Sequence, residues 1–265
     1  MIVHADATTW LAVLHEGCAD LVYVDPPFNS GATRARGGYS YSDAWSVEAY
    51  AALISGVVTQ CARVLRPGGA LWVHCDESSD WRIRALLESV PTLTFHNSVV
   101  WNYYNKISNA ARKFASAHDT LFLYYKNGAP LDFFPQEEAR DAPVKFLKRK
   151  NVGGVLTNAK DASGRCEYVT RTTKGVNDVW RIPCLQPASR EWAGYPTQKP
   201  LALLSRVIAS TSITGGLVID PMCGSGTTLL AAQQTGRRFL GADSSEHAVA
   251  VARARLGLVT TGEDS

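Results

Sequence analysis

Short apolar runs alternate with amphipathic stretches over most of the chain. The apolar runs are typical of buried strands and cover residues 21–24, 70–74, 99–101, 120–125, 216–220 and 238–243. The amphipathic stretches predict helices over residues 47–65, 81–90, 200–211, 227–235 and 245–256. Glycine-containing turns separate several of these segments, as at Pro67-Gly68-Gly69. Strands that alternate with helices predict an α/β fold, a doubly wound and mostly parallel sheet with helices on both faces.

Residues 128–192 interrupt this alternation because they are polar, basic and irregular in pattern. From Arg140 to Arg181 there are ten lysines and arginines and four acids, a net charge of +6 that leaves −3 on the rest of a chain whose total is +3. A basic segment on a slightly acidic body is typical of phosphate binding, although a solvated loop would have the same composition. We therefore predict an insert over 128–192, between domain halves 1–127 and 193–265.

The overall composition excludes several classes of protein. Hydrophobic residues make up 46% and charged residues 19% of the 265 residues, so the chain is not disordered, collagenous or a coiled coil. No apolar run is long enough to span a membrane, and the N-terminus lacks the basic start of a secretory signal. The six cysteines have no CxxC spacing, which indicates reduced thiols and no metal site in a cytoplasmic protein.

The first candidate for chemistry is the sequence Asp25-Pro26-Pro27-Phe28, directly after an apolar strand. Ligands of open parallel sheets bind outside the carboxyl ends of the strands. The two prolines stiffen the backbone and remove two amide donors, so Asp25 is presented as an acceptor beside the flat face of Phe28. An acceptor beside an aromatic ring suits a planar base with an exocyclic amine. A simple Asp-capped turn is the structural alternative.

The second candidate is a glycine-rich turn between a strand and a helix near the C-terminus. Its residues are Asp220, Pro221, Met222, Cys223, Gly224, Ser225, Gly226 and Thr227. Glycines allow a ligand to approach the backbone closely, and the following helix start points amides at it. The turn lacks the lysine of a Walker loop and the third glycine of a dinucleotide site. Asp243 ends the next strand, where a carboxylate can accept the hydroxyls of a ribose.

Two weaker signals complete the set. Thr197 and Lys199 precede a helix that begins near Pro200, and both could meet a ligand carboxylate, although a plain helix cap would also explain them. Asp6 follows a short N-terminal strand, where it could hold a nucleoside.

In this order the motifs resemble the β-class DNA amino-methyltransferases that use S-adenosylmethionine. In that family the Asp-Pro-Pro-aromatic element precedes the glycine-rich cofactor element, as Asp25–Phe28 precedes Asp220–Gly226 here. The resemblance covers most of the chain, and residues 128–192 fall where the family carries its target-recognition region. It implies a Rossmann-like methyltransferase fold with a small target-recognition insert. It also implies site-specific methylation of double-stranded DNA, as in restriction-modification systems of prokaryotes and phages.

The resemblance also implies a role for each motif. A flipped base would stack on Phe28, with its amine held by the Asp25 carboxylate and the Pro26 carbonyl. The cofactor would meet Asp6 at its adenine, Asp243 at its ribose, the 223–227 turn at its methionine part, and Thr197 and Lys199 at its carboxylate. Asp220 and Met222 are further expected cofactor contacts. We expect Lys145, Lys148, Arg149 and Lys150 to contact DNA phosphates. A homodimer, a cognate restriction endonuclease and a nucleoid-associated location are further expectations.

The chain departs from the usual family pattern at two of these positions. Met222 stands where the family usually has Phe, and Phe28 replaces a frequent Tyr. The resemblance implies that an aspartate at position 25 goes mostly with adenine N6 as the target, with cytosine N4 as the alternative. A nicotinamide oxidoreductase, a non-catalytic nucleic-acid-binding module, and an RNA or protein amine substrate are less favoured. A nucleophilic Cys184, suggested by Pro183-Cys184, is disfavoured because this pair is not at a strand end.

Overall fold

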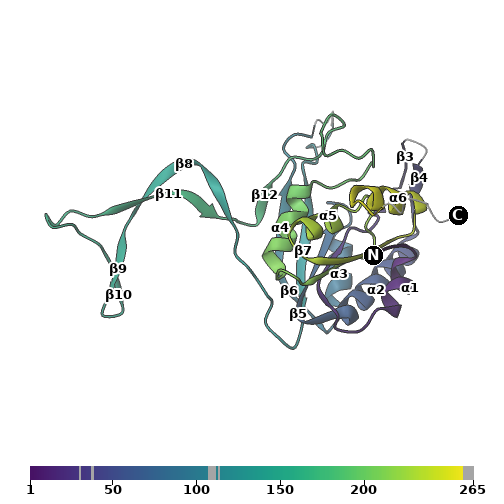
Figure 1. Ribbon diagram of the computed structural model, residues 1–265, viewed down its shortest axis with the longest axis horizontal. Coiled ribbons are helices and arrows are strands. Elements are labelled where there is room, and N and C mark those ends of the chain that lie inside the picture. Colours follow the sequence, from purple (N-terminus) through teal and green to yellow (C-terminus); the bar gives the residue numbers. More distant parts are fainter. Residues whose placement is uncertain (30, 37–38, 107–111, 113, 259–265) are drawn as a thin grey trace. The chain divides into compact units, whose positions relative to one another are not determined.

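The computed structural model describes residues 1–29, 31–36, 39–106, 112 and 114–258 (Figure 1). Its centre is an eight-stranded sheet in the order β1-β14-β13-β2-β5-β7-β6-β12. The strands are β1 (Ile2–His4), β14 (Arg238–Asp243), β13 (Leu217–Asp220), β2 (Ala19–Val24), β5 (Leu65–Cys75), β7 (His118–Lys126), β6 (Leu93–Asn102) and β12 (Val179–Arg181). Only the pairs that β7 makes with β5 and β6 are antiparallel in this sheet. The predicted fold class, a mostly parallel α/β sheet, is confirmed.

Helices cover both faces of the sheet. They are α1 (Ala7–Val13), α2 (Val47–Val64), α3 (Asp80–Glu88), α4 (Leu201–Thr211), α5 (Thr227–Gln234) and α6 (Glu246–Arg255). On one face α1, α2 and α3 pack against Leu71 and Val73 of β5 in one apolar cluster. Side chains alternate along a strand, so Trp72 faces the other way, where its indole donates to Thr211 of α4 (2.8 Å). β2 is buried throughout, as expected for a central parallel strand covered on both faces.

The expected turn at Pro67-Gly68-Gly69 lies inside β5 as an irregularity. The pairing register with β2 shifts between Ala19↔Leu65 and Leu21↔Ala70. Gly68 has φ +75°, and a Cβ there would lie 2.3 Å from the carbonyl oxygen of Pro130. Only glycine fits this position, because the following chain passes directly against its backbone.

Residues Pro135–Asn177 form a second compact unit. In it β8 (Glu137–Leu147) pairs antiparallel with β11 (Tyr168–Gly175), and β9 (Arg149–Val152) pairs antiparallel with β10 (Val155–Asn158). The segment 128–192 is therefore not irregular throughout, because strands form between Glu137 and Gly175 and at Val179–Arg181. Most side chains of these strands are exposed and none is buried, so burial does not impose the alternation by which strands are recognised in sequences. The unit is also narrower than the predicted insert, since β12 belongs to the central sheet.

One helix and two strands in the first part of the chain also escaped the sequence pattern. α1 has only seven residues and is capped by Asp6, whose Oδ1 accepts from the amide of Thr9 (3.0 Å). β3 (Ala32–Arg36) and β4 (Tyr39–Asp43) pair antiparallel after the Asp-Pro-Pro-Phe sequence. In the described part of the chain, no helix has both the length and the apolar character needed to cross a membrane.

Candidate active site

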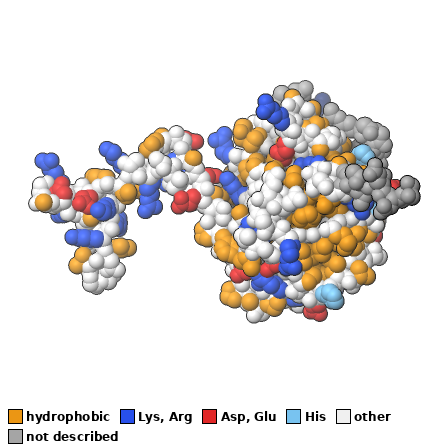
Figure 2. Space-filling view, in the orientation of Figure 1, with side chains coloured by type: hydrophobic (Ala, Val, Ile, Leu, Met, Phe, Trp, Pro, Cys, Tyr) orange, Lys and Arg blue, Asp and Glu red, His pale blue; other side chains and the backbone are white. Residues whose placement is uncertain are grey.

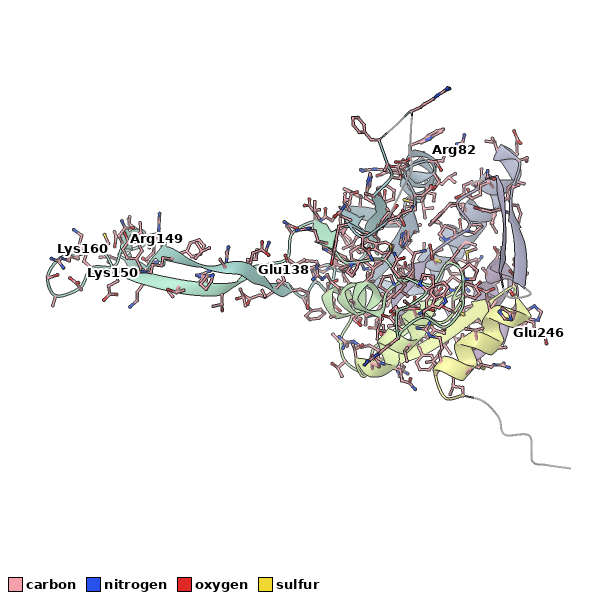
Figure 3. All side chains as sticks on the ribbon, turned by 90° about the horizontal axis from the view of Figure 1, so that it is seen from above. Arg82, Glu138, Arg149, Lys150, Lys160 and Glu246 are labelled. Atoms are coloured by element: carbon pink, nitrogen blue, oxygen red, sulfur yellow. The ribbon has the colours of Figure 1, made fainter. Side chains whose placement is uncertain are left out.

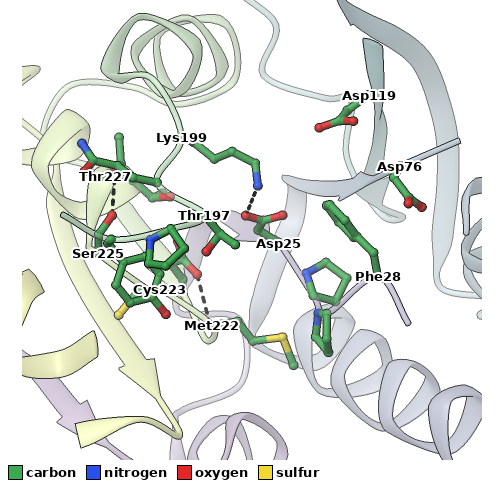
Figure 4. Close-up of a pocket in the computed structure, with 18 of the residues that line it drawn as sticks. Asp25, Phe28, Asp76, Asp119, Thr197, Lys199, Met222, Cys223, Ser225 and Thr227 are labelled. Carbon is green, nitrogen blue, oxygen red and sulfur yellow. Dashed lines mark hydrogen bonds and ion pairs between the residues drawn. The ribbon is translucent and has the colours of Figure 1, made fainter. Parts of the chain in front are cut away.

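A cavity of about 1250 Å³ lies at the carboxyl ends of the parallel strands of the larger unit (Figure 4). Asp25 follows β2, Asp220 ends β13 and Asp243 ends β14, and all three line it. Except for Gly226, each residue predicted to contact the base or the cofactor lines this one cavity. The topology thus brings together motifs from the two ends of the chain, because β2 and β13 are neighbours in the sheet.

The Asp-Pro-Pro-Phe element leaves β2 and is held by the residue that follows it. Asn29 has φ +54°, a left-handed conformation that asparagine tolerates better than most residues. Its amide donates to Asp43 Oδ1 (2.9 Å), and its side-chain oxygen accepts from the amide of Trp45 (2.7 Å). These bonds tie the end of the element to the segment before α2 and so fix where Phe28 lies.

Lys199 forms an ion pair with the Asp25 carboxylate. Its Nζ donates to Asp25 Oδ2 at 2.5 Å and lies 5.4 Å from the centroid of the Phe28 ring. Figure 4 shows the lysine side chain directed at Asp25. The sequence predicted that Lys199 meets a ligand carboxylate, but in this structure its partner is Asp25, which that prediction did not include.

A buried polar chain behind Phe28 was not predicted. His74 on β5 is fully buried, and its Nε2 lies 3.0 Å from Asp119 Oδ2 on β7, while its Nδ1 lies 2.8 Å from the hydroxyl of Tyr23. The other oxygen of Asp119 accepts from the Tyr103 hydroxyl (3.1 Å). The ring centroids of Phe28 and His74 are 5.9 Å apart, so this chain backs the aromatic face. In the sequence, these groups could have been recognised as polar residues within two apolar strands, His74 in β5 and Asp119 in β7.

Burial and bonding act in opposite directions on the Asp119 carboxyl. Burial tends to raise its pKa, but the bond to His74, the charges of His74 and Lys199 and the bond from Tyr103 outweigh it and lower the pKa. Asp119 is therefore the acceptor in its bond with His74. Burial first, and then the negative charge of Asp25, raises the pKa of Tyr23 far above its usual value. Tyr23 therefore remains a protonated phenol beside His74, and Asp119 remains an ionised carboxylate.

The glycine-rich turn between β13 and α5 is shaped by Asp220. Its Oδ1 accepts from the amide of Met222 (3.1 Å). Burial raises the pKa of Asp220 to about 7, against the opposing effect of bonds from Thr228 and Met222. Gly226 has φ +77°, and a Cβ on it would lie 2.8 Å from Ala252 Cβ of α6. Gly226 thus packs against a helix rather than lining the cavity.

Asp243 has the geometry of a ribose-binding acid. Its Oδ2 accepts from the amide of Gly224 (2.8 Å) and its Oδ1 from the amide of Ser245 (2.9 Å). Each oxygen can accept a second bond, so two hydroxyls of a ribose fit this carboxylate. Burial raises the pKa of Asp243, although both amides lower it. An acid at a strand end, a turn of backbone amides and a nearby lysine form a donor set that fits a nucleoside carrying an amino acid.

Arg255 of α6 supports the turn and was also missed. Its Nη1 donates to the Ser225 carbonyl (2.7 Å), to Ser225 Oγ (3.1 Å) and to Thr227 Oγ1 (2.9 Å). Burial lowers the pKa of this guanidinium, which reflects its position behind the turn. An arginine in a helix that ends in Arg-Ala-Arg looks like an ordinary surface residue in the sequence.

Cys184 lies in the wall of the cavity, although it is not at a strand end. Its amide donates to Asn105 Oδ1 (2.8 Å), and its carbonyl accepts from Asn105 Nδ2 (2.9 Å). These paired bonds give Pro183-Cys184 a structural role in the wall. In the described residues, no group of three or more His, Cys, Asp and Glu side chains is arranged to hold a metal ion.

The four cations predicted to contact DNA lie in the second unit. Lys145 is on β8, Arg149 and Lys150 are on β9, and all are exposed. Lys148 pairs with Glu167 at 2.8 Å, so part of its charge is neutralised. Lysines and arginines occur along the whole unit (Figure 2). Arg149 and Lys150 lie toward its Lys160 end, and Glu138 lies toward the opposite end (Figure 3).

The open sheet, the acids at its strand ends and the glycine-rich turn define a nucleoside-binding enzyme of the methyltransferase type. Residues 19–254 match the family model described as DNA methylase, which covers N6 and N4 methyltransferases. The chain belongs to this family. It is a DNA methyltransferase of the adenine-N6 or cytosine-N4 group, with S-adenosylmethionine as its cofactor.

Relatives and solved structures agree with this family. The DNA adenine methyltransferase YhdJ of Escherichia coli (strain K12) is 26% identical over 98% of this chain and 83% of its own length. The type II methyltransferase M.ScaI of Streptomyces caespitosus is 27% identical over 97% of this chain and 81% of its own length. The M1.HpyAVI–SAM complex has a TM-score of 0.66 at 22% identity, covering 97% of this chain and 99% of its own. The cytosine-N4-specific PvuII DNA methyltransferase has a TM-score of 0.67 at 16% identity, covering 99% and 87%.

Proposed function

We propose that this enzyme methylates the N6 amine of adenine at specific sites in double-stranded DNA. The observation that carries the proposal is the Asp25–Phe28 element, which shares one cavity with the glycine-rich turn. By resemblance, an aspartate in this element goes mostly with adenine, and the similar protein YhdJ is described as an adenine methyltransferase. Cytosine N4 is the second candidate, because cytosine also presents an amine beside a ring nitrogen.

In the proposed mechanism, Asp25, Pro26 and Phe28 hold the target base. The base leaves the duplex and stacks on the Phe28 ring. Its amine donates one hydrogen bond to the Asp25 carboxylate and one to the Pro26 carbonyl. Pro27 keeps the backbone stiff, so these acceptors are in place before the base arrives. Positioning of the amine, and stabilisation of the positive charge that develops on it by Asp25, supply the acceleration.

The cofactor is held, in this proposal, by residues from both ends of the chain. Asp243 accepts the ribose hydroxyls and Asp6 lies at the adenine. Thr197 and Lys199 meet the carboxylate, and the methionine part lies along the turn that contains Asp220, Met222, Cys223, Gly224, Ser225, Gly226 and Thr227. S-adenosylmethionine, when bound, supplies a methyl group on a positively charged sulfur. The turn would hold the methionine part in the cavity that Asp25 also lines.

The second unit is the proposed target-recognition part. Its charge suits a DNA backbone, and an antiparallel pair of strands such as β8 and β11 has the width to enter a major groove. Lys145, Lys148, Arg149 and Lys150 are assigned to phosphates, because phosphate contacts set register and orientation without reading the sequence. A homodimer, a cognate restriction endonuclease and a cytoplasmic, nucleoid-associated location are also proposed, on the resemblance to restriction-modification enzymes.

The target base is tested in DNA from cells that express the protein. Sequencing with modification detection gives the methylated base and its surrounding sequence, and mass spectrometry of the nucleosides identifies the product. We expect N6-methyladenine at one short motif, absent from cells that express Asp25→Ala. N4-methylcytosine without N6-methyladenine would overturn the choice of adenine.

A further inference from the structure

The Lys199 ammonium has the same two neighbours that the proposed mechanism gives to the target amine. Its Nζ donates to the Asp25 carboxylate at 2.5 Å and lies 5.4 Å from the Phe28 ring centroid. A protonated primary amine above an aromatic ring, bonded to a carboxylate, occupies the same kind of place as the exocyclic amine of a stacked base. The base and Lys199 therefore compete for one acceptor.

This competition is unequal, because the lysine is charged and the pair is shielded from water. The side chains of Lys199 and Asp25 are only 13% and 19% exposed, so solvent and salt screen them less than a surface pair. A charge-assisted bond is roughly twice as strong as a neutral one. A neutral base amine does not displace the lysine unless the ammonium gains another anion, since a buried cation without a partner is costly.

The lysine side chain can move while its backbone stays fixed. Gln198 is 7% exposed, and its side chain bonds the amide of Ala193 (2.8 Å) and the carbonyl of Glu191 (2.7 Å). Glu191 in turn accepts from the first amide of α4, at Leu201 (2.6 Å). The loop is therefore anchored on both sides of Lys199, and a flexible four-carbon stem carries the ammonium. Thr197, on the same anchored loop, also lines the cavity.

We propose that Lys199 holds the place of the target amine on Asp25 and leaves it for the carboxylate of the cofactor, so that cofactor and base bind cooperatively. This inference rests on the proposed function, because it uses the roles given to Asp25 and to the cofactor carboxylate. Lys199 is then a positioning residue. In the protein without cofactor it keeps the base acceptor occupied, and with cofactor it completes the cofactor site and frees Asp25. Linkage requires that weakening the Asp25–Lys199 pair strengthens cofactor binding.

Two ligands separate the amino-acid part of the cofactor from its nucleoside. S-adenosylhomocysteine carries the carboxylate and ammonium of the amino acid without a charged sulfur, and 5′-methylthioadenosine has the nucleoside and sulfur but neither of these charged groups. Isothermal titration calorimetry gives the dissociation constant of each for the full-length protein. With Asp25→Asn, which releases Lys199, we expect S-adenosylhomocysteine to bind about fivefold tighter or more. The affinity for 5′-methylthioadenosine should not change.

Two lysine variants separate the proposed movement of Lys199 from simple repulsion between the Asp25 carboxylate and the carboxylate of the ligand. Lys199→Met should weaken S-adenosylhomocysteine binding, and in that background Asp25→Asn should no longer tighten it. Lys106 is the matched control, because it also lines the cavity but lies 4.8 Å from the Tyr103 ring centroid, without contact to Asp25 among the described ion pairs. Lys106→Met should leave the response to Asp25→Asn intact.

Two results would overturn the exchange. One is an unchanged affinity for S-adenosylhomocysteine in Asp25→Asn, and the other is the same gain with and without Lys199. Failure of the proposed function would look different. If the wild-type protein bound neither ligand, the cofactor site itself, and the exchange with it, would be wrong.

Discussion

At the scale of single residues, the site depends on how a few carboxyl groups are partnered. Asp25 is paired with a lysine, Asp119 with a histidine and a tyrosine, and Asp220 with backbone and hydroxyl donors inside the protein. These environments differ, so the carboxyl group that we propose as a ligand acceptor at Asp25 forms part of a buried wall at Asp119 and shapes a turn at Asp220. Two predictions follow from the partners of individual acids.

Asp25→Ala should bind the cofactor at least as tightly as the wild-type protein does, because it also frees Lys199, and it should lose methylation. Asp25 directly follows β2, and among the described bonds its side chain bonds Lys199, so its removal leaves the proposed ribose and turn contacts in place. Loss of one acceptor that stabilises the developing charge typically costs about 100-fold or more in rate. The measurement is methyl transfer to DNA, alongside calorimetry with S-adenosylhomocysteine. Methylation at a near-normal rate would contradict the role of Asp25.

Asp220→Asn should change how stability depends on pH. Burial raises the pKa of Asp220 to about 7 in the folded protein, above its value of about 4 in an unfolded chain. The contribution of Asp220 is therefore fully present below about pH 4 and is lost as pH rises through about 7. Urea unfolding at pH 5 and pH 8 should show a loss of stability in the wild type that is smaller in Asp220→Asn. Equal losses in both proteins would show that Asp220 is not the titrating group.

At the scale of elements, the site is made of connections rather than of the helices and strands themselves. The Asp-Pro-Pro-Phe element leaves β2, the glycine-rich turn leaves β13, and the loop of Thr197 and Lys199 precedes α4. Each is fixed by bonds to a neighbouring element, as Asn29 is to Asp43 and as the turn is to Arg255. A change in such a support should alter ligand binding without direct contact.

Arg255→Met should weaken cofactor binding through the turn. The substitution removes three hydrogen bonds from the guanidinium to Ser225 and Thr227. A hydrogen bond from a charged donor contributes about 1.5–3 kcal/mol to stability, and only the part that shapes the turn affects ligand binding. We expect the dissociation constant of S-adenosylhomocysteine to rise about tenfold, measured by calorimetry.

Arg63→Met is the control for this prediction. Arg63 also donates to backbone carbonyls, those of Leu11 and Leu14, but it does not line the cavity. Loss of these bonds in Arg63→Met should lower the free energy of unfolding and leave the affinity for S-adenosylhomocysteine unchanged. If both variants weakened binding equally, the effect would be one of general stability.

At the scale of the whole molecule, charge and chemistry are carried by different units. The larger unit holds the cavity, and the unit Pro135–Asn177 holds exposed cations with Ala159 as its buried hydrophobic residue. Two-stranded ribbons of this kind are only marginally stable in isolation. An exposed, basic surface suits a large polyanionic partner such as the DNA that this family modifies.

Replacing Lys145, Lys148, Arg149 and Lys150 with alanine should weaken binding to all DNA sequences alike. Each lost phosphate contact makes the negative slope of log affinity against log salt concentration shallower by about one. Lys148 should contribute less, since it pairs with Glu167. Fluorescence anisotropy at several salt concentrations measures both affinity and slope. Alanine at Arg84 and Arg238, two surface arginines of the larger unit, is the control, and an equal effect there would remove the assignment to this unit.

The sequence by itself determined what depends on near neighbours along the chain. Apolar runs and amphipathic stretches specify the six predicted strands and five predicted helices, because burial on the sheet and on one helix face imposes those periods. The order of the motifs identified the family. The strands of Pro135–Asn177 were not predictable in this way, since mostly exposed side chains carry no such period.

Only the tertiary structure decided which groups meet. Lys199 pairs with Asp25, 174 residues away, and His74 with Asp119, 45 residues away. Such pairs depend on which strands are neighbours in the sheet and on how a loop is anchored, and neither is encoded in local spacing. The position of Lys199 before a helix predicted only that the lysine binds an anionic group. The folded chain shows that this group is the Asp25 carboxylate.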